Sequence, residues 1–344
     1  MTTQDPLSRR DAGILHSIVE SYLQTGEPVA SLALSRFSRT NLSAASIRNI
    51  MAELSEQGFL SQPHTSAGRV PTQKAIQAYV KGLAVRVVSA ELARMRTELR
   101  RAQSIESRVE RSSQILTELT RNVGIVAAIP GAGQILDRVE LVALPAGKVL
   151  LIVVTNDGRV RNQIIDLSES IPGGELASIR NYLNENFSGW TLNAIRTELA
   201  RRLETESAAY DFVLGRLMHL HMRGLLEIAL DPDVHLGGTS NLLGIDLHIT
   251  REAMRELFRT LEEKKRLLEI LERFIAQDSQ QLDIQVGLEE IHPALAGLAL
   301  VGGSVHLPNG MSTKVAVLGP LRMDYSRALS AVAHMQQAMR SVPA

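Results

Sequence analysis

The 344-residue sequence contains no cysteine, which removes several classes of protein at once. Without thiols the chain forms neither a disulfide framework nor a cysteine-based metal site, and it cannot use thiol catalysis. The absence fits a reducing compartment, and we expect a cytoplasmic protein. Histidine offers no metal site either, because His219 and His221 stand two positions apart and would point to different faces of a helix. We therefore expect no metal, no cofactor and no enzymatic activity.

Long apolar runs are also missing. No stretch approaches the roughly 18 apolar residues that a membrane-spanning helix needs, and the N-terminal MTTQDPLSRRDAG lacks the apolar core of a signal peptide. We therefore expect no membrane partner. Hydrophobic residues make up 44% and charged residues 22% of the chain, which is an ordinary globular balance. The length allows about two or three domains.

The chain has no net charge, with 37 Lys+Arg against 37 Asp+Glu, but the charges are unevenly placed. Between residues 30 and 88 the only acidic side chains are Glu53 and Glu56. The basic side chains of the same segment are Arg36, Arg39, Arg48, Arg69, Lys74, Lys81 and Arg86. A basic segment inside a neutral chain indicates one nucleic-acid-binding module among others, the alternative being chance clustering of surface charge.

The centre of this basic segment, Asn41 to Thr72, predicts a helix followed by a β-ribbon. An apolar stripe recurs at three- and four-residue spacing, and it consists of Ile47, Ile50, Met51 and Leu54. Ser43 can cap the helix start, and Gly58 suits the left-handed position after its end. With helices expected over residues 7–26 and 31–37, the pattern is typical of a winged helix-turn-helix. The alternative is an ordinary amphipathic helix and loop.

The side of this helix opposite the stripe carries the candidate DNA contacts. Arg48 is suited to guanine and Asn49 to adenine, so these two are the predicted base readers. Small or hydroxyl side chains at the helix start and in the ribbon would let the backbone approach and would bind phosphates. The full predicted set is Ser43, Ala45, Ser46, Arg48, Asn49, His64, Thr65 and Arg69. For His64 a role as a turn residue is equally compatible with the sequence.

The string SAASIRNIMAELSEQGFLSQPHTSAGRVPTQKAIQAYV resembles the heat-inducible transcription repressor family, HrcA. Later stretches agree in order, namely LLIVVTNDGRV, GGTSNLL, LFRTLEEKKRLLEIL and GPLRMDYSRAL. After GGTSNLL the family usually continues Gln-Pro-Glu-Phe, whereas this chain has GIDL over residues 244–247. The resemblance implies a dimeric repressor of chaperonin and chaperone operons that binds an inverted-repeat operator, with the chaperonin as modulator and release on heat stress.

The rest of the chain predicts a multidomain α+β protein. Residues 1–88 form the winged helix-turn-helix, and 89–121 a solvated, Arg-rich helical linker. Strand patterns over 122–190 and 277–344 enclose a mostly helical segment, 191–276. The resemblance implies that the enclosing parts form a GAF-like domain and that the enclosed part is an inserted dimerisation domain.

A heptad pattern marks the expected dimer contact within one continuous helix over residues 250–277. Its apolar positions include Met254, Leu257, Leu261, Leu268 and Leu271. The pattern is barely long enough to predict a coiled coil, and packing within one chain explains it equally well. A repressor that reads two half-sites requires a twofold dimer, however, because operator symmetry mirrors protein symmetry.

The GPLRMDY stretch, residues 319–325, lies between an expected strand and the last expected helix. We expect it to pack the insertion against the sheet, the alternative being the lining of a ligand pocket. If such a pocket exists, the protein is a ligand-controlled winged-helix regulator with a small-molecule-sensing GAF-like domain. A third possibility is an enzyme with an accessory nucleic-acid-binding domain.

Overall fold

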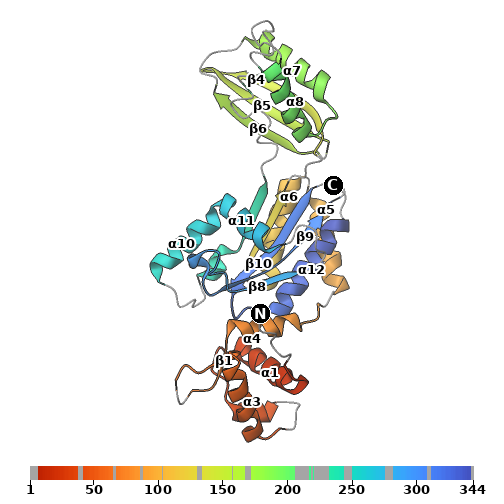
Figure 1. Ribbon diagram of the computed structural model, residues 1–344. Helices are drawn as coiled ribbons and strands as arrows, with labels where there is room; N and C mark the ends of the chain where they lie inside the picture. The colour runs from red at the N-terminus through yellow and green to blue at the C-terminus, as the bar shows by residue number, and fades with distance from the viewer. Residues whose placement is uncertain are drawn as a thin grey trace.

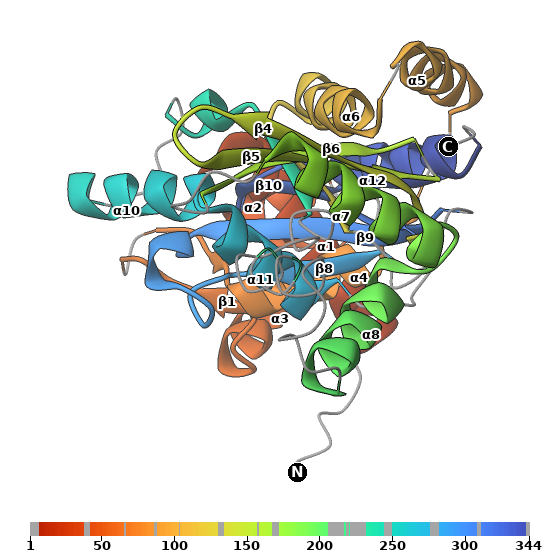
Figure 2. The same ribbon diagram turned by 90° about the horizontal axis from the view of Figure 1, so that it is seen from above.

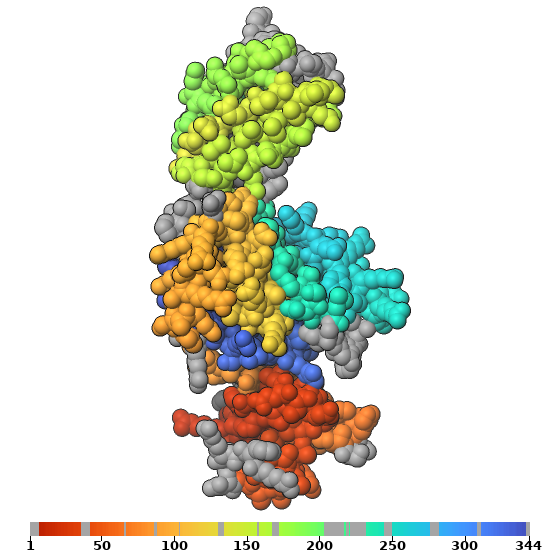
Figure 3. Space-filling model, turned by 180° about the vertical axis from the view of Figure 1, so that it is seen from behind, coloured from red at the N-terminus to blue at the C-terminus, as the bar shows by residue number. Residues whose placement is uncertain are grey.

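The computed structural model is a mixed α+β chain whose parts are stacked along one axis (Figure 1). An N-terminal unit lies at one end, a unit built on a large sheet in the middle, and a smaller sheet unit at the other end (Figure 3). No helix in the described part of the chain is long and apolar enough to cross a membrane. The structure describes residues 7–37, 42–64, 67–85, 88–102, 104–129, 134–156, 158–166, 172–205, 217, 220, 232–243, 250–275, 282–307 and 311–341.

The N-terminal unit follows from its local start and stop signals. Ser8 accepts a hydrogen bond from the Asp11 amide at the start of the first helix, and Gly26 ends that helix in the left-handed conformation with φ of 75°. Thr72 caps the last helix through the Ala75 amide. The elements are α1 (Arg9–Thr25), α2 (Ser31–Phe37), α3 (Ala44–Glu56), β1 (Leu60–Ser61), β2 (Val70–Pro71) and α4 (Gln73–Lys81).

The central unit is an antiparallel sheet covered by helices on both faces (Figure 2). Its strand order is β7-β3-β10-β9-β8. Burial on both faces explains why the longest strands read as continuous apolar runs instead of alternating. The strands are β3 (Val123–Ile129), β7 (Asp233–Gly237), β8 (Asp283–Val286), β9 (Leu298–His306) and β10 (Ser312–Pro320). The helices are α5 (Ser89–Arg101), α6 (Ile105–Thr120), α10 (Arg251–Glu262), α11 (Lys264–Phe274) and α12 (Tyr325–Ser341), with short 3-10 turns at Thr239–Leu242 and Pro293–Leu295.

The expected solvated linker over residues 89–121 is instead part of the central unit. Helices α5 and α6 pack against α12 and bury Leu92, Leu99 and Leu116. Arg94 and Glu98 form an i,i+4 ion pair at 2.9 Å on α5. Glu98 also accepts a 2.8 Å hydrogen bond from the Arg111 guanidinium on α6. The charges therefore join two packed helices, and the sequence expectation missed the apolar stripe between them.

The inserted unit begins earlier than the sequence pattern predicted. Strands β4 (Leu136–Leu144), β5 (Lys148–Thr155) and β6 (Val160–Asp166) form a separate three-stranded sheet. Helices α7 (Gly173–Phe187) and α8 (Leu192–Thr205) cover one face of it and share its own apolar core. The enclosed unit is therefore α+β and starts near residue 134, whereas we expected a mostly helical one from 191. The β5–β6 hairpin turns at Gly158, which has a φ of 77°, and Asp-Gly between two strands is a strong hairpin signal in the sequence.

The heptad segment belongs to the central unit and is not one helix. Helix α10 ends at Glu262 and α11 starts at Lys264, because Glu263 between them has an extended backbone with φ of −79° and ψ of 95°. Leu257, Leu261 and Leu271 are buried in the core between these helices and the sheet. Met254 and Leu268 are partly buried against the same core. The expectation of a continuous helix was wrong, and the apolar stripe packs within the chain.

The joints between the units differ. The apolar core of the N-terminal unit continues without a break into the side of the central sheet covered by α5, α6 and α12. The inserted unit has a separate core and meets the central unit through charges. Arg159 and Arg161 at the start of β6 both bind the Asp233 carboxylate at the start of β7, and Arg161 lies 3.4 Å from Glu106.

Candidate nucleic-acid interface

Helix α3 is held by one face and presents the other to solvent. Ile47, Ile50, Met51 and Leu54 are all buried against the rest of the N-terminal unit, as their spacing predicted. The Ser43 hydroxyl accepts a 3.2 Å hydrogen bond from the Ser46 amide, which satisfies one of the unpaired donors of the first turn. These contacts prevent α3 from rotating about its own axis. The positions of the buried residues in the sequence therefore determine which side chains face solvent.

The exposed side of α3 carries most of the predicted contacts. Ala45, Arg48 and Asn49 are exposed, and Ser43 is exposed at the helix start. Ser46 is half-buried, and its hydroxyl lies 3.0 Å from that of Ser43. Within the part of the chain that is described, no acidic side chain pairs with Arg48. The Arg48 guanidinium and the side-chain carboxamide of Asn49 can therefore hydrogen-bond to another molecule.

The ribbon after α3 is tied to the turn between α1 and α2. Strands β1 and β2 pair antiparallel. Beyond them, the backbones of Val29 and Arg69 exchange two hydrogen bonds of 2.8 and 2.9 Å. Gly68 makes this approach possible, because an added Cβ there would lie 2.5 Å from the Val29 carbonyl oxygen. The ribbon therefore keeps a fixed position beside α3.

Arg48 from the helix and Arg69 from the ribbon line one hollow of about 360 Å³. The Arg69 guanidinium also donates to the Gln62 side chain across the ribbon. Gln62 and Ser31, which line the same hollow, were not among the predicted contacts. The position of Gln62 opposite Arg69 could have been predicted from the register of the hairpin. Two arginines beside one concave surface favour an anionic partner.

The two remaining predicted contacts lie at the ribbon tip. His64 is exposed, and its carbonyl accepts a 2.9 Å hydrogen bond from the Ala67 amide. Thr65 lies outside the described residues. The structure therefore brings Arg48 and Arg69 to one hollow and exposes Ser43, Ala45 and Asn49 on the same helix as Arg48 or at its start. His219 and His221 also lie outside the described residues.

Replacing Gly68 by alanine is expected to loosen the ribbon. The new Cβ would press on the backbone of Pro28 and Val29, which cannot rotate away as a flexible side chain would. Overpacking of this kind costs about 1–3 kcal/mol, and we expect a lower melting temperature and weaker DNA binding. Gly13 on α1 is the matched control, because nothing lies within 4 Å of its added Cβ. Gly13→Ala should stabilise the protein slightly; an unchanged melting temperature of Gly68→Ala would contradict the role of this contact.

The GPLRMDY stretch faces the N-terminal unit, not the insertion. The guanidinium of Arg322 packs directly on Gly26. A Cβ added to Gly26 would lie only 1.7 Å from a guanidinium nitrogen of Arg322. Residues 322–326 line a hollow of about 400 Å³ together with Glu20 and Tyr79. Burial and the nearby carboxylates of Glu20 and Asp324 raise the pKa of the Tyr79 hydroxyl. The stretch thus fixes the N-terminal unit on the central one, which corrects our expectation that it packs the insertion against the sheet.

A second contact fixes the same orientation from α4. Gln73 donates a 2.7 Å hydrogen bond to Glu289, and Gln77 donates to the Val286 carbonyl at 3.3 Å. Gly287, with φ of 80°, leaves room for the Gln73 side chain. Together with the continuous apolar core, these contacts determine how α3 is aimed relative to the central sheet.

Comparison with known proteins decides the family. A family model described as HrcA protein C terminal domain matches residues 106–329, well over half of the chain. The chain belongs to the HrcA family. It is 33% identical to the heat-inducible transcription repressor HrcA of Sorangium cellulosum, with 98% of each chain covered. It is 32% identical to the protein of the same name from Geobacter sulfurreducens, with 95% of each covered.

The HrcA-family assignment agrees with the fold. A solved structure described only as that of a hypothetical protein covers 98% of this chain and 99% of its own, with a TM-score of 0.59 and 21% sequence identity. Similarity at this level shows a shared fold over the full length. The family resemblance read from the sequence is confirmed by the family model and by the two relatives, whose alignments cover 95–98% of this chain.

Proposed function

We propose that the protein is a heat-inducible transcription repressor that binds an inverted-repeat operator as a homodimer. The single observation that carries the proposal is the exposed face of α3, where Arg48 and Asn49 lie beside a ribbon bearing Arg69. Membership of the HrcA family supports the repressor role. The N-terminal unit then acts as a winged helix-turn-helix, with α3 as recognition helix and the β1–β2 ribbon as wing.

In this proposal the residues divide by role. Arg48 and Asn49 read base edges in the major groove, because a guanidinium pairs with guanine and a carboxamide with adenine in two-point contacts. The hydroxyls of Ser43 and Ser46, at the positive end of the α3 dipole, bind phosphate and set the register of the helix. Ala45 lets the helix approach closely. Arg69, with His64 and Thr65 at the wing tip, contacts the backbone or the minor groove.

Dimerisation is proposed to use the outer face of the inserted sheet. One face of that sheet packs on α7 and α8, and the other exposes the apolar side chains of Val142, Val160 and Ile164. The strand register places Val142 and Ile164 on either side of Leu150, and the exposed fractions of Val142 and Ile164 are 45% and 59%. A contiguous apolar patch on a sheet marks an interaction surface. A second copy of the chain is the occupant that a twofold operator requires.

The heptad leucines are not the centre of this proposed interface, because their own chain already covers them. The central unit, a GAF-like domain in this proposal, would orient the two N-terminal units. The remaining parts of the proposal rest on the family resemblance: chaperone operons are the targets, heat inactivates the repressor, and the chaperonin maintains its active fold. A dimer of marginal stability suits this role, since its stability depends on subunit concentration.

Arg69→Ala is expected to weaken binding to operator and scrambled duplex alike, because a wing contact to the backbone carries no base information. A plot of the logarithm of the association constant against the logarithm of the salt concentration has a negative slope. The magnitude of that slope should fall by about 1 for each phosphate per subunit that the variant no longer neutralises. Fluorescence anisotropy at several salt concentrations measures both quantities. Lys81→Ala, an exposed lysine in the last turn of α4, is the charge-matched control. A loss of affinity confined to the operator would assign Arg69 to base reading instead.

A further inference from the structure

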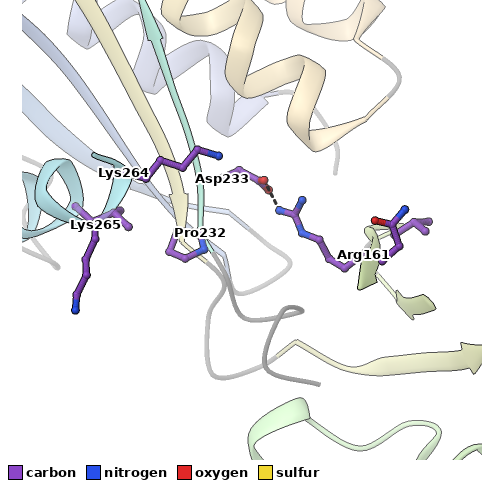
Figure 4. A pocket seen from close by; sticks show the side chains of 8 residues that line it. Arg161, Pro232, Asp233, Lys264 and Lys265 are labelled. Carbon is purple, nitrogen blue, oxygen red and sulfur yellow. Dashed lines mark ion pairs between the residues drawn. The ribbon is translucent and has the colours of Figure 1, made fainter. Parts of the chain in front are cut away.

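A hollow of about 510 Å³ lies at the joint between the inserted unit and the central unit (Figure 4). Strand β6 contributes Val160, Arg161 and Asn162, the start of β7 contributes Pro232 and Asp233, and the first turns of α11 contribute Lys264, Lys265 and Leu268. The volume falls within the roughly 300–1,000 Å³ that small-molecule sites occupy. Sites of this kind are common where two domains meet.

The hollow has an excess of positive charge. The carboxylate of Asp233 is already bound by Arg159 and Arg161. Burial alone would raise the pKa of Asp233, but the hydrogen bonds from Arg161 and Arg159 outweigh it and lower that pKa, so the carboxylate stays ionised. The exposed Lys264 and Lys265 form no ion pair with the residues that the structure describes. Asp233 and Glu106 offset the charges of Arg159 and Arg161, so the exposed Lys264 and Lys265 make the rim positive and attractive to anions.

The start of α11 adds to this field. Glu263 precedes the helix, but its side chain makes no capping hydrogen bond to the first turn. The free amides at this end carry the positive end of the helix dipole. Figure 4 shows Lys264 extending from α11 on the side of Asp233 and Arg161, while Lys265 leaves the same turn in the opposite direction. Val160, 55% exposed, and Leu268 add apolar surface to the wall.

We propose that this joint is a binding site for a small phosphate-bearing organic anion. Lys264 and the amides at the start of α11 would hold the phosphate, and the exposed Lys265 would add to the positive field at the rim. Val160 and Leu268 would pack on the uncharged part of the ligand. Because the walls come from two units with separate cores, the anion binds best at one relative orientation of the units. The site involves neither α3 nor the ribbon, so it is independent of the proposed DNA contacts.

Isothermal titration calorimetry of the full chain with adenosine monophosphate, inorganic pyrophosphate and adenosine tests the site. The two phosphate-bearing probes should bind, more weakly as salt rises, and adenosine should not. At ten times its dissociation constant, a bound probe should raise the melting temperature by about 3 °C. In Lys264→Gln/Lys265→Gln the dissociation constants should rise at least tenfold.

The matched control is Lys81→Gln/Lys148→Gln, which removes two exposed lysines that do not line the hollow. It should bind the phosphate-bearing probes like the wild type. If both double variants bind the probes equally weakly, net charge alone explains the weaker binding and the proposed site is wrong. The site is also wrong if neither phosphate-bearing probe binds the wild type at millimolar concentration. Binding of phosphate-bearing probes and adenosine alike would also contradict the proposal. Operator affinity is not part of the readout, so the result stands apart from the proposed function.

Discussion

Replacing Arg48 and Asn49 together by alanine should lower the affinity of the proposed dimer for the operator at least 100-fold while leaving the fold intact. Each two-point contact to a base contributes about 1–3 kcal/mol of discrimination, and each 1.4 kcal/mol is a factor of ten in affinity. Both side chains are exposed, so their removal opens no cavity in the core. Anisotropy measurements on an operator duplex and a scrambled duplex of equal length give the affinity and the preference together.

The control for this double variant is Arg10→Ala, which removes an exposed arginine from α1 of the same unit. It should keep the operator preference and the melting temperature of the wild type. For Arg48→Ala/Asn49→Ala we expect the melting temperature to stay unchanged and the preference for operator over scrambled DNA to disappear. If the double variant still prefers the operator as strongly as the wild type does, α3 is not the recognition helix.

Charging the exposed face of the inserted sheet should dissociate the proposed dimer. In Val142→Glu/Ile164→Glu, twofold pairing would bury four carboxylates against apolar side chains, and unpaired buried charge is strongly unfavourable. Both positions are exposed in the single chain, so we expect the subunit to fold normally. A monomer binds one half-site only, so it loses the gain in affinity that a dimer obtains by binding two linked half-sites. That gain is commonly 10²–10⁴-fold. Sedimentation velocity and operator binding should therefore show a monomer with at least 100-fold weaker affinity.

Leu243→Glu provides the comparison, since Leu243 is 65% exposed but lies outside the inserted unit. It should sediment like the wild type. A dimeric Val142→Glu/Ile164→Glu variant would place the subunit contact elsewhere, and the partly buried Met254 and Leu268 would then be the next residues to replace. If the variant no longer dimerises but binds the operator as tightly as the wild type, operator binding does not depend on dimerisation.

Local signals in the sequence predicted the N-terminal unit well, because its contacts are short-range. Ser43 and the four apolar residues of α3 act within one helix, and periodicity alone identifies them. The same holds for the β5–β6 hairpin, whose turn residues determine the pairing. The exposed face of α3 then follows from the buried one, so Arg48 and Asn49 could be selected without a structure.

The domain boundaries could not be predicted in this way, because they depend on which strands pair over long distances. Strand β3 is a continuous apolar run and β4 carries charged residues, but this local difference does not say which strands each of them pairs with. Strand β7 was missed because it is a short edge strand whose only apolar side chains are Val234 and Leu236, too few to establish a period. The heptad pattern of α10 and α11 was real, but periodicity cannot say whether the partner is another chain or the sheet of the same chain.

The most direct test of the central claim is a hydroxyl-radical footprint of the full chain on DNA carrying an inverted repeat from upstream of chaperone genes. The proposed dimer predicts two protected half-sites related by twofold symmetry, on one face of the duplex and separated by whole helical turns, about 10–10.5 base pairs each. With Arg48→Ala/Asn49→Ala the protection should vanish at the same concentration. A single unsymmetrical footprint, or the same pattern from wild type and variant, would contradict a dimer that reads DNA through α3.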